Sequence, residues 1–373
     1  MAERVRAGVR WLYEFCLRWL LDGHRATYGL AIMRIGYGVI TLVVMALHLP
    51  YLSYSFGAAS AWTAPLAELS AVRDFPWPLV GGIFSTDDSD GVLLAKYLVL
   101  MGVTLLFTLG WRMRIIAPLF LVLWLSFTTL NPLITNTGHF QTFRVMLIFL
   151  IFADLSRRWS LDARRRRRRA EGRPTLFERI GLRRLQLPER LTYDGRPVVP
   201  AWLPVLLNNG AVLLIAFQLI VIYVVSALWK IQGSTWLGGY AVYYPLRVEE
   251  LTLIPWLNEL IWPITPIVMI ASWATVYFQL FFPVLLLNRW TRVFALIGIT
   301  GMHLGIAVLL SLPFFSAVMM FADAVFVRDS TWRWMIDGIR ARLPGRRRAR
   351  PRGRRRRTPE AEPAAVGGSG YPV

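Results

Sequence analysis

Long apolar runs, separated by short polar or basic segments, dominate the chain between residues 27 and 327. A helix that crosses a bilayer takes about 20 mostly apolar residues. Eight runs reach or approach that length, and they predict spans at 27–49, 91–110, 115–130, 140–155, 203–229, 263–287, 293–310 and 312–327. The pattern therefore predicts an all-α, polytopic transmembrane helix bundle of about eight spans.

The segments that flank the predicted bundle have a different pattern. Ahead of the first span, apolar residues recur at helical spacing between arginines: Val5, Val9, Leu12, Cys16 and Trp19. This spacing predicts an amphipathic helix within residues 1–24, which either lies on the inner membrane surface or packs under the bundle. The transmembrane domain follows over residues 25–328, and residues 329–373 are expected to form a basic and then disordered tail.

Positive charge is concentrated in alternate connections between the spans. The formal net charge is +20, and most of the excess lies in residues 157–173 and 340–357. The N-terminus, the loops after spans two, four and six, and the tail are basic, whereas the loops after spans one and five are not. Because basic loops stay on the cytoplasmic side, both termini and the basic loop 157–200 are predicted to be cytoplasmic, in a multi-pass protein of the cell membrane. The arginine-rich segments are expected to contact anionic lipid rather than nucleic acid.

Five charged residues lie inside the predicted spans, where a charge is costly. Lys96 lies near the outer end of span two and Arg144 in the outer half of span four, and the other three lie deeper or toward the inner side. Arg34 lies well inside span one, and Asp154 and Asp323 lie toward the inner ends of spans four and eight. One interpretation is structural, with Arg34 paired to one of the two aspartates. The other is a buried charge network that tunes a site. The sequence leaves the choice of partner open.

The lysines are unusual because the chain otherwise uses arginine. Of 42 Lys+Arg residues only Lys96 and Lys230 are lysines, and Lys230 ends the fifth span. An arginine would anchor the end of a helix equally well but cannot release its proton, whereas a partly desolvated lysine can act as a base. The predicted orientation places Lys230, His139 and His303 toward one face, the extracytoplasmic one. Ordinary roles remain open for each: a snorkelling cap for Lys230, a loop histidine for His139 and a packing histidine for His303.

Four segments resemble a known membrane family, the HTTM domain, which occurs in the vitamin K-dependent γ-glutamyl carboxylase and in many bacterial proteins. "SALWKIQGSTWLGGYAVYYPL" (226–246) is similar to its signature helix end, with Lys230, Trp236 and the Tyr243–Tyr244 pair. "NTGHFQTFRVMLIFLIFADLSRRWSLD" (136–162) looks like a second family segment. "MRIGYGV" (33–39) and "MHLGIAVLLSLPFFSAVMMFADAVF" (302–326) resemble the first and last spans.

The resemblance implies a chemistry. In the carboxylase, a lysine at the position resembling Lys230 deprotonates a vitamin K quinol, oxygen then gives an epoxide, and CO₂ adds to glutamate. A histidine at the position resembling His139 stabilises charged intermediates. The resemblance makes Lys230 the base, His139 its partner, and Trp236, Tyr243 and Tyr244 the lining of a quinone pocket. Arg144 and His303 are added to the predicted substrate-binding residues. The prediction for Arg144 rests only on its depth in the membrane.

Two functions follow from these observations. The first is a membrane enzyme with a reduced quinone (vitamin K or menaquinol-like) as cofactor, with O₂ and CO₂ as co-reactants and no metal. The second is a non-catalytic membrane protein for the maturation, export or tolerance of a secreted peptide. The second is motivated by a difference from the carboxylase, because a basic tail stands here where the carboxylase continues into a large substrate-binding domain.

Overall fold

A computed structural model describes residues 2–57, 59–60, 82–174, 192–193 and 196–342. Within these ranges the protein is almost entirely helical. A helix occupies each of the eight predicted spans: α2 (Thr27–His48), α4 (Asp90–Leu109), α5 (Met113–Thr128), α7 (Gly138–Leu150), α10 (Trp202–Lys230), α14 (Thr265–Leu285), α15 (Arg289–Leu309) and α16 (Pro313–Asp323). The tail beyond residue 342 lies outside the described residues.

Shorter elements connect these helices. The sequence ahead of α2 forms α1 (Ala2–Leu21), and α8 (Leu161–Ala170) and α17 (Asp329–Arg342) carry many of the arginines. The other connecting elements are η1 (Leu49–Tyr51), α3 (Leu52–Phe56), α6 (Pro132–Thr135), α11 (Ser234–Leu237), α12 (Tyr243–Leu246), η3 (Glu249–Leu251), α13 (Pro255–Ile261) and η4 (Ala324–Phe326). One antiparallel pair of two-residue strands, β1 (Thr192–Tyr193) and β2 (Arg196–Pro197), precedes α10.

The helices differ in whether they are long enough to cross a bilayer alone. Five segments have the length and apolar composition for this: Thr27–Phe56, Asp90–Leu109, Trp202–Lys230, Thr265–Leu285 and Arg289–Leu309. The other three, α5, α7 and α16, are 16, 13 and 11 residues long. At about 1.5 Å per residue, α7 and α16 each span only about 20 Å of the roughly 30 Å apolar core. The protein is a helical membrane protein with five clear candidate spans.

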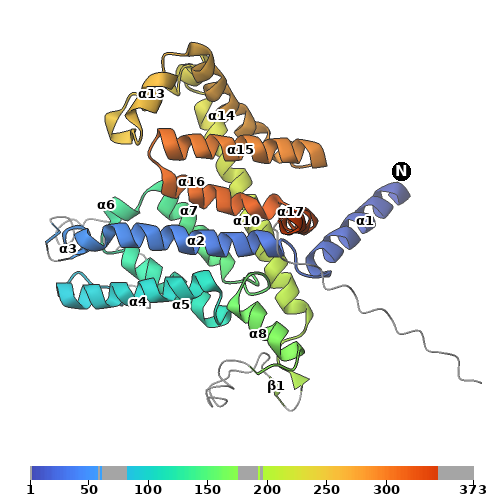
Figure 1. The fold of residues 1–373 in the computed structure, drawn as a ribbon. Helices are drawn as coiled ribbons and strands as arrows, with labels where there is room; N and C mark the ends of the chain where they lie inside the picture. The colour runs from blue at the N-terminus through green and yellow to red at the C-terminus, as the bar shows by residue number, and fades with distance from the viewer. Residues whose placement is uncertain (1, 58, 61–81, 175–191, 194–195, 343–373) are drawn as a thin grey trace, which may run out of the picture. The chain divides into compact units, whose positions relative to one another are not determined.

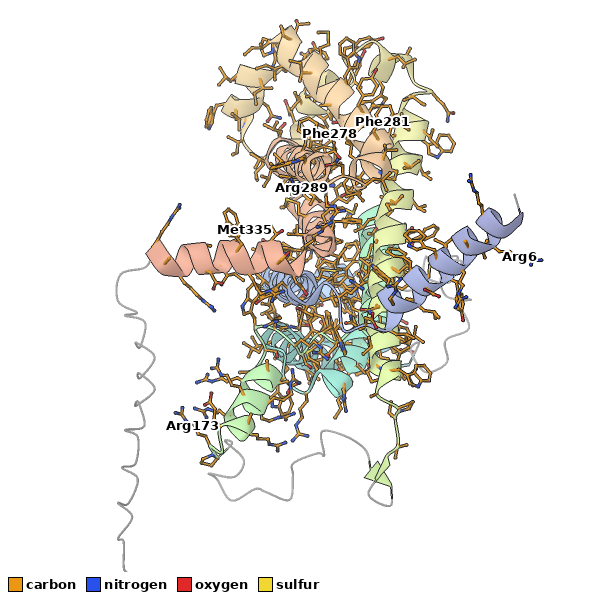
Figure 2. All side chains as sticks on the ribbon, turned by 90° about the vertical axis from the view of Figure 1, so that its right-hand side faces the viewer. Arg6, Arg173, Phe278, Phe281, Arg289 and Met335 are labelled. Atoms are coloured by element: carbon orange, nitrogen blue, oxygen red, sulfur yellow. The ribbon has the colours of Figure 1, made fainter. Side chains whose placement is uncertain are left out.

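Five helices lie side by side in one row, and a sixth crosses them. Along the row the neighbours are α15, α16, α2, α4 and α5, and each contacts the next (Figure 1). Helix α10 runs across this row and contacts α7, α14 and α16. Figure 2 shows the crossing clearly, because α10 is seen along its length while α2 and α15 are seen end-on. The crossing brings the second half of α10 against α14, α15 and α16.

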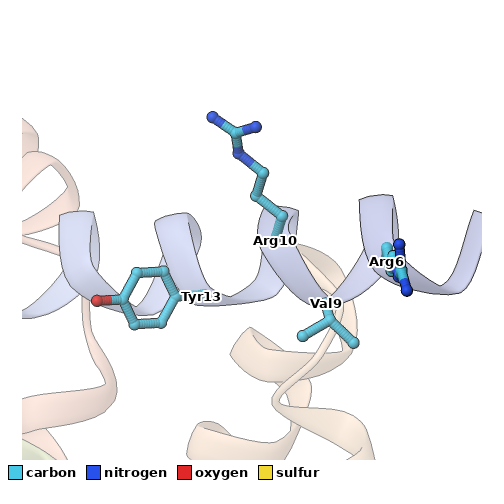
Figure 3. A pocket seen from close by; sticks show the side chains of 4 residues that line it. All are labelled: Arg6, Val9, Arg10 and Tyr13. Atoms are coloured by element: carbon cyan, nitrogen blue, oxygen red, sulfur yellow. The ribbon is translucent and has the colours of Figure 1, made fainter. Parts of the chain in front are cut away.

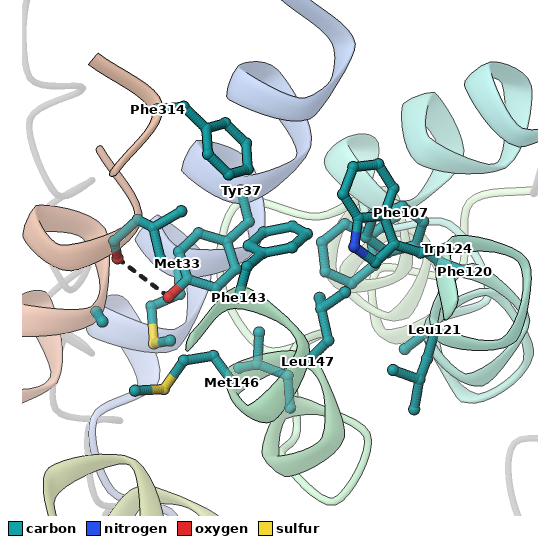
Figure 4. Packing of buried hydrophobic residues seen from close by; sticks show 14 of the residues in the cluster. Met33, Tyr37, Phe107, Phe120, Leu121, Trp124, Phe143, Met146, Leu147 and Phe314 are labelled. Atoms are coloured by element: carbon teal, nitrogen blue, oxygen red, sulfur yellow. Dashed lines mark hydrogen bonds between the residues drawn. The ribbon is translucent and has the colours of Figure 1, made fainter. Parts of the chain in front are cut away.

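Aromatic side chains fill the space between α2, α5 and α7. Tyr37 of α2 lies against Phe143 of α7 at 4.9 Å between ring centroids, and Phe143 meets Trp124 of α5 edge-on (Figure 4). The hydroxyl of Tyr37 donates to the backbone carbonyl of Val318 on α16 at 3.1 Å. This core packs the short helices α7 and α16 inside the bundle, which accounts for their largely apolar buried faces without requiring that they span the bilayer.

Helix α1 carries its apolar residues largely uncovered. Val9, Leu12 and Tyr13 are each more than half exposed, and Arg10 and Val9 project from opposite sides of the helix (Figure 3). The predicted amphipathic helix therefore exists. The last turn of α1 is joined to the bundle, because the side chain of Asn209 on α10 donates to the carbonyls of Trp19 and Leu20. The two predicted placements of the helix both stay predictions.

Candidate functional site

Lys230 is the last residue of α10, and its side chain turns into the bundle. Its Nζ donates to Ser226 Oγ one turn earlier and to Gln279 Oε1 of α14 at 2.9 Å. The indole ring of Trp236 lies beside it, with Nζ 5.4 Å from the ring centroid. No carboxylate forms an ion pair with Lys230 within the part of the chain that the structure describes. A snorkelling lysine would extend away from the protein, so this side chain is not placed as one.

The segment after α10 folds back and brings Trp236 to the lysine. Gly239 has a positive φ of 78°, which the left-handed region allows readily only for glycine. The returning backbone is tied to α14 by two hydrogen bonds: Trp273 Nε1 donates to Leu237 O at 3.1 Å, and Val242 N donates to Ser272 Oγ at 3.1 Å. The predicted loop 231–262 is therefore a structured cover rather than a free loop.

Three polar side chains from three helices form a buried chain about two helical turns from Lys230 along α10. The hydroxyl of Tyr223 (α10) donates to Asp323 Oδ2 (α16) at 2.7 Å and lies 3.3 Å from His303 Nε2 (α15). All three residues are at most 3% exposed. Two atoms at the ends of this chain, His303 Nδ1 and Asp323 Oδ1, have no hydrogen-bond partner among the described residues.

The buried chain and Lys230 are neighbours. Tyr223, Ser226 and Lys230 are spaced three and four residues apart and so leave the same face of α10. Gln279, which accepts from Lys230, also contacts Met302 Sδ at 3.6 Å through its Nε2, and Met302 precedes His303. The charge of Lys230 lies close enough to His303 to act on it electrostatically.

His139 and Arg144, predicted to assist Lys230, lie elsewhere. His139 is the second residue of α7, is hydrogen-bonded to Thr137 Oγ1, and packs against Phe140 and Phe314. Arg144 donates to the carbonyl of Thr135 at 2.8 Å. Within the described residues no hydrogen bond, ion pair or ring contact joins either side chain to Lys230. The histidine that the structure does bring toward the lysine is His303.

Tyr243 and Tyr244 form a separate aromatic cluster in the cover segment. Tyr243 contacts Trp262 at 5.8 Å between centroids, and its hydroxyl accepts from Arg247 at 2.6 Å. Tyr244 is 55% exposed and packs edge-on against Tyr243. Of the three aromatic residues predicted to line a pocket at the lysine, Trp236 alone has a contact with Lys230 that the structure records.

The predicted pairing of Arg34 with an aspartate is wrong. Arg34 is fully buried, and its guanidinium donates instead to backbone carbonyls at the end of α4 and in the 158–159 turn. The acceptors are Phe107, Thr108, Arg158 and Trp159. A planar guanidinium with five N–H groups can bind several carbonyls at once. Phe107 and Thr108 lie in the last turn of α4, where a helix leaves carbonyls without intrahelical partners.

The two aspartates have other partners. Asp154 accepts from Ser156 and from Arg157 Nε at 2.9 Å, and His24 lies 3.6 Å away. Asp323 accepts from Tyr223, as described above. The "WSLD" segment is structural too: Asp162 accepts from the backbone N–H groups of Arg112 and Met113, and so caps the start of α5.

Three residues of the site were not among those predicted: Tyr223, Ser226 and Gln279. The spacing of Tyr223 and Ser226 from Lys230 on one face of a long apolar helix was a usable signal. Gln279 could not be assigned in this way, because nothing in the spacing of α14 indicates which residue faces α10.

Comparison with known families supports the resemblance drawn from the sequence. Residues 196–332 match the family model described as the HTTM domain. The match includes Lys230, His303 and Asp323, but not His139 or Arg34. No curated protein and no solved structure matches the chain.

Proposed function

We propose that this membrane protein, whose residues 196–332 carry an HTTM domain, is an enzyme that uses Lys230 as a base on a quinol. The chemistry would be of the epoxidation and carboxylation kind that the vitamin K-dependent γ-glutamyl carboxylase performs. The observation that carries the proposal is the inward turn of Lys230 onto two neutral acceptors, Ser226 and Gln279.

The surroundings of Lys230 suit a group that gains and loses a proton. A neutral amine has two hydrogens, and the two acceptors occupy both, which leaves the nitrogen lone pair unused. When the amine is protonated, its charge lies beside the π face of Trp236, which attracts cations. Both states therefore have partners in the same geometry, whereas a carboxylate neighbour would favour only the ammonium.

The donor set also fits a quinol. When bound, a quinol supplies an acidic hydroxyl hydrogen and a flat aromatic ring. Lys230 is placed to take that proton, and the indole of Trp236 offers a flat apolar surface beside it. The orientation inferred from the arginines would place this site toward the extracytoplasmic side of the cell membrane, with arginine-rich segments such as α8 on anionic lipid at the other side.

The two lysines of the chain provide a matched test. Lys230→Arg keeps the charge but removes the ability to release a proton. Lys96→Arg is the control, because Lys96 is ion-paired to Asp88 at 2.6 Å, outside the site. Both variants would be purified and assayed in lipid for quinol oxidation and for incorporation of labelled bicarbonate. We expect Lys230→Arg to lose roughly a hundredfold or more of the activity, the usual contribution of a general base, and Lys96→Arg to keep it.

The alternative, a non-catalytic role in the maturation, export or tolerance of a secreted peptide, is favoured by one observation. His139, which the carboxylase resemblance makes the partner of the base, has no contact with Lys230 among the described residues. In that role Lys230→Arg would be silent, whereas disruption of the cover segment 231–262 would abolish peptide maturation. Wild-type activity that Lys230→Arg leaves unchanged would reject the enzymatic proposal.

A further inference from the structure

With a neutral imidazole, the buried chain of His303, Tyr223 and Asp323 can keep both of its hydrogen bonds while the Tyr223 hydrogen points either way. A tyrosine hydroxyl carries one hydrogen. If that hydrogen goes to Asp323 Oδ2, the Tyr223 oxygen must accept from His303 Nε2–H, and His303 Nδ1 is then bare. If it goes instead to His303 Nε2, the Tyr223 oxygen accepts from a protonated Asp323, and His303 carries its hydrogen on Nδ1.

These two arrangements use the same heavy-atom positions and differ by one proton. The first holds an aspartate carboxylate and the second a carboxylic acid. In both, the imidazole is neutral, but its hydrogen has moved from Nε2 to Nδ1. A proton that arrives at Nδ1 therefore displaces the Nε2 hydrogen to the Tyr223 oxygen, and the Tyr223 hydrogen passes to Asp323 Oδ2. Each bond that breaks is matched by one that forms, and no charge is left on the histidine.

We propose that His303, Tyr223 and Asp323 form a one-proton acceptor that takes up, at His303 Nδ1, the proton that Lys230 removes from its substrate. This inference rests on the proposed function for the source of the proton. His303 Nδ1 is buried and has no hydrogen-bond partner among the described residues, as a receiving atom requires. Transfer from the Lys230 ammonium restores the neutral amine and leaves the proton on Asp323.

The arrangement of the helices favours Lys230 as the source. Lys230 lies two turns beyond Tyr223 on the same face of α10, about 10 Å along the axis at 1.5 Å per residue. Gln279 connects the lysine to Met302, the residue before His303. Two other titratable groups interact with the three residues of the chain: Lys230 of α10, whose charge acts on His303, and Tyr37 of α2, which interacts with Asp323. The side chain that α14 contributes, Gln279, is neutral.

The first test reads the histidine tautomer and needs no activity. The chain has four histidines, so protein labelled with ¹⁵N-histidine gives few ring signals, and His303→Gln identifies those of His303. In full-length protein in lipid, lowering the pH should convert His303 directly from the Nε2–H to the Nδ1–H tautomer, with no imidazolium. Tyr223→Phe and Asp323→Asn should each abolish the switch. A wild-type His303 that keeps one tautomer, or that becomes doubly protonated, overturns the proposal.

The control is Tyr37→Phe, which removes a hydroxyl from the same core. Tyr37 donates to a backbone carbonyl and not to the chain of three residues. The tautomer switch should survive in this variant. Loss of the switch in Tyr37→Phe as well as in Tyr223→Phe would mean that packing, and not the hydrogen-bonded chain, sets the tautomer, and would also overturn the proposal.

The second test separates this inference from the proposed function. The measurement is quinol oxidation after rapid mixing. In Tyr223→Phe the first turnover should have a normal amplitude, because Lys230 can still take one proton. The steady-state rate should fall at least tenfold, because Lys230 cannot pass that proton on. If Lys230→Arg is inactive while Tyr223→Phe turns over normally, Lys230 is the base and the acceptor chain is wrong. If Lys230→Arg is fully active, the proposed function fails, and the tautomer measurement then decides whether the three residues hold a proton at all.

Discussion

Replacing Arg34 tests how a fully buried arginine is stabilised without a hydrogen-bonded carboxylate. Its guanidinium donates to carbonyls from two segments, among them Thr108 O and Trp159 O, the latter at 2.8 Å. Arg34→Met fills a similar volume but leaves both acceptors, which are partly buried, without this donor. At roughly 1–3 kcal/mol for each unpaired buried acceptor, the loss is about 4 kcal/mol.

An opposing effect must be subtracted from that loss. Removing a buried charge relieves its desolvation, which in other proteins is worth about 1–4 kcal/mol when the whole polar group is replaced. Here only the donor is replaced, so the cost of the unpaired carbonyls should exceed the gain from the relieved desolvation. We expect the free energy of unfolding to fall by about 2–3 kcal/mol. Arg34→Lys should lose about half as much, because one ammonium cannot bind both segments as a planar guanidinium does.

The measurement is equilibrium unfolding in mixed micelles with an increasing fraction of a denaturing detergent. The 16 tryptophans provide a strong fluorescence signal. The control is Arg10→Lys on α1, where the side chain is 83% exposed and pairs only with Glu14, and its stability should not change. An Arg34→Met protein as stable as the wild type, or more stable, would refute the reasoning and would show that desolvation of the guanidinium outweighs its hydrogen bonds.

Two further predictions concern the backbone near Arg34 and the junction ahead of α2. Gly110→Ala should destabilise the protein by at least about 2 kcal/mol in the same unfolding assay, because Gly110 has a φ of 70° and a Cβ there would lie 2.5 Å from Ser160 Cβ. The control is Gly91→Ala at the other end of α4, where a Cβ meets open space and the stability should not change. Equal losses of stability in the two variants would contradict the argument. Two effects lower the pKa of His24: burial is the larger, and the charge of the adjacent Arg157 guanidinium is the smaller. The His24 imidazole therefore binds a proton less readily in the folded chain than in the unfolded chain. The contribution of His24 to stability should therefore be fully present above the ordinary pKa of about 6.5, and should be lost as pH falls from there through the lower pKa of the folded state. His24→Gln should flatten that part of the profile, and an unchanged slope would count against the assignment.

Much of the helical architecture was predictable because the bilayer restricts what an apolar run can do. A backbone in lipid must satisfy its own hydrogen bonds, so each of the eight runs had to form a helix. Run length alone did not distinguish a helix that crosses the membrane from one packed within the bundle. Helices α7 and α16 show the difference: their apolar residues, among them Phe143 and Val318, face other helices in the core.

The sequence by itself determined that this is a helical membrane protein and that Lys230 is an exceptional residue. Both conclusions depend on properties carried by the chain alone: the length of its apolar runs, its almost exclusive use of arginine, and the resemblance of residues 226–246 to a family signature. The face that Lys230 shares with Tyr223 was also readable, since spacing along one helix sets which residues lie together.

Tertiary structure alone decided which polar groups meet. Arg34 binds carbonyls and not aspartates, Asp323 binds Tyr223, and Lys230 faces Gln279 and not His139. Each of these partners comes from a segment distant in the sequence. Spacing fixes the rotation of residues around their own helix, but the height at which two helices cross and the faces they turn to each other follow from packing of the whole bundle. For that reason the candidate base could be recognised in the sequence, while its surroundings could not.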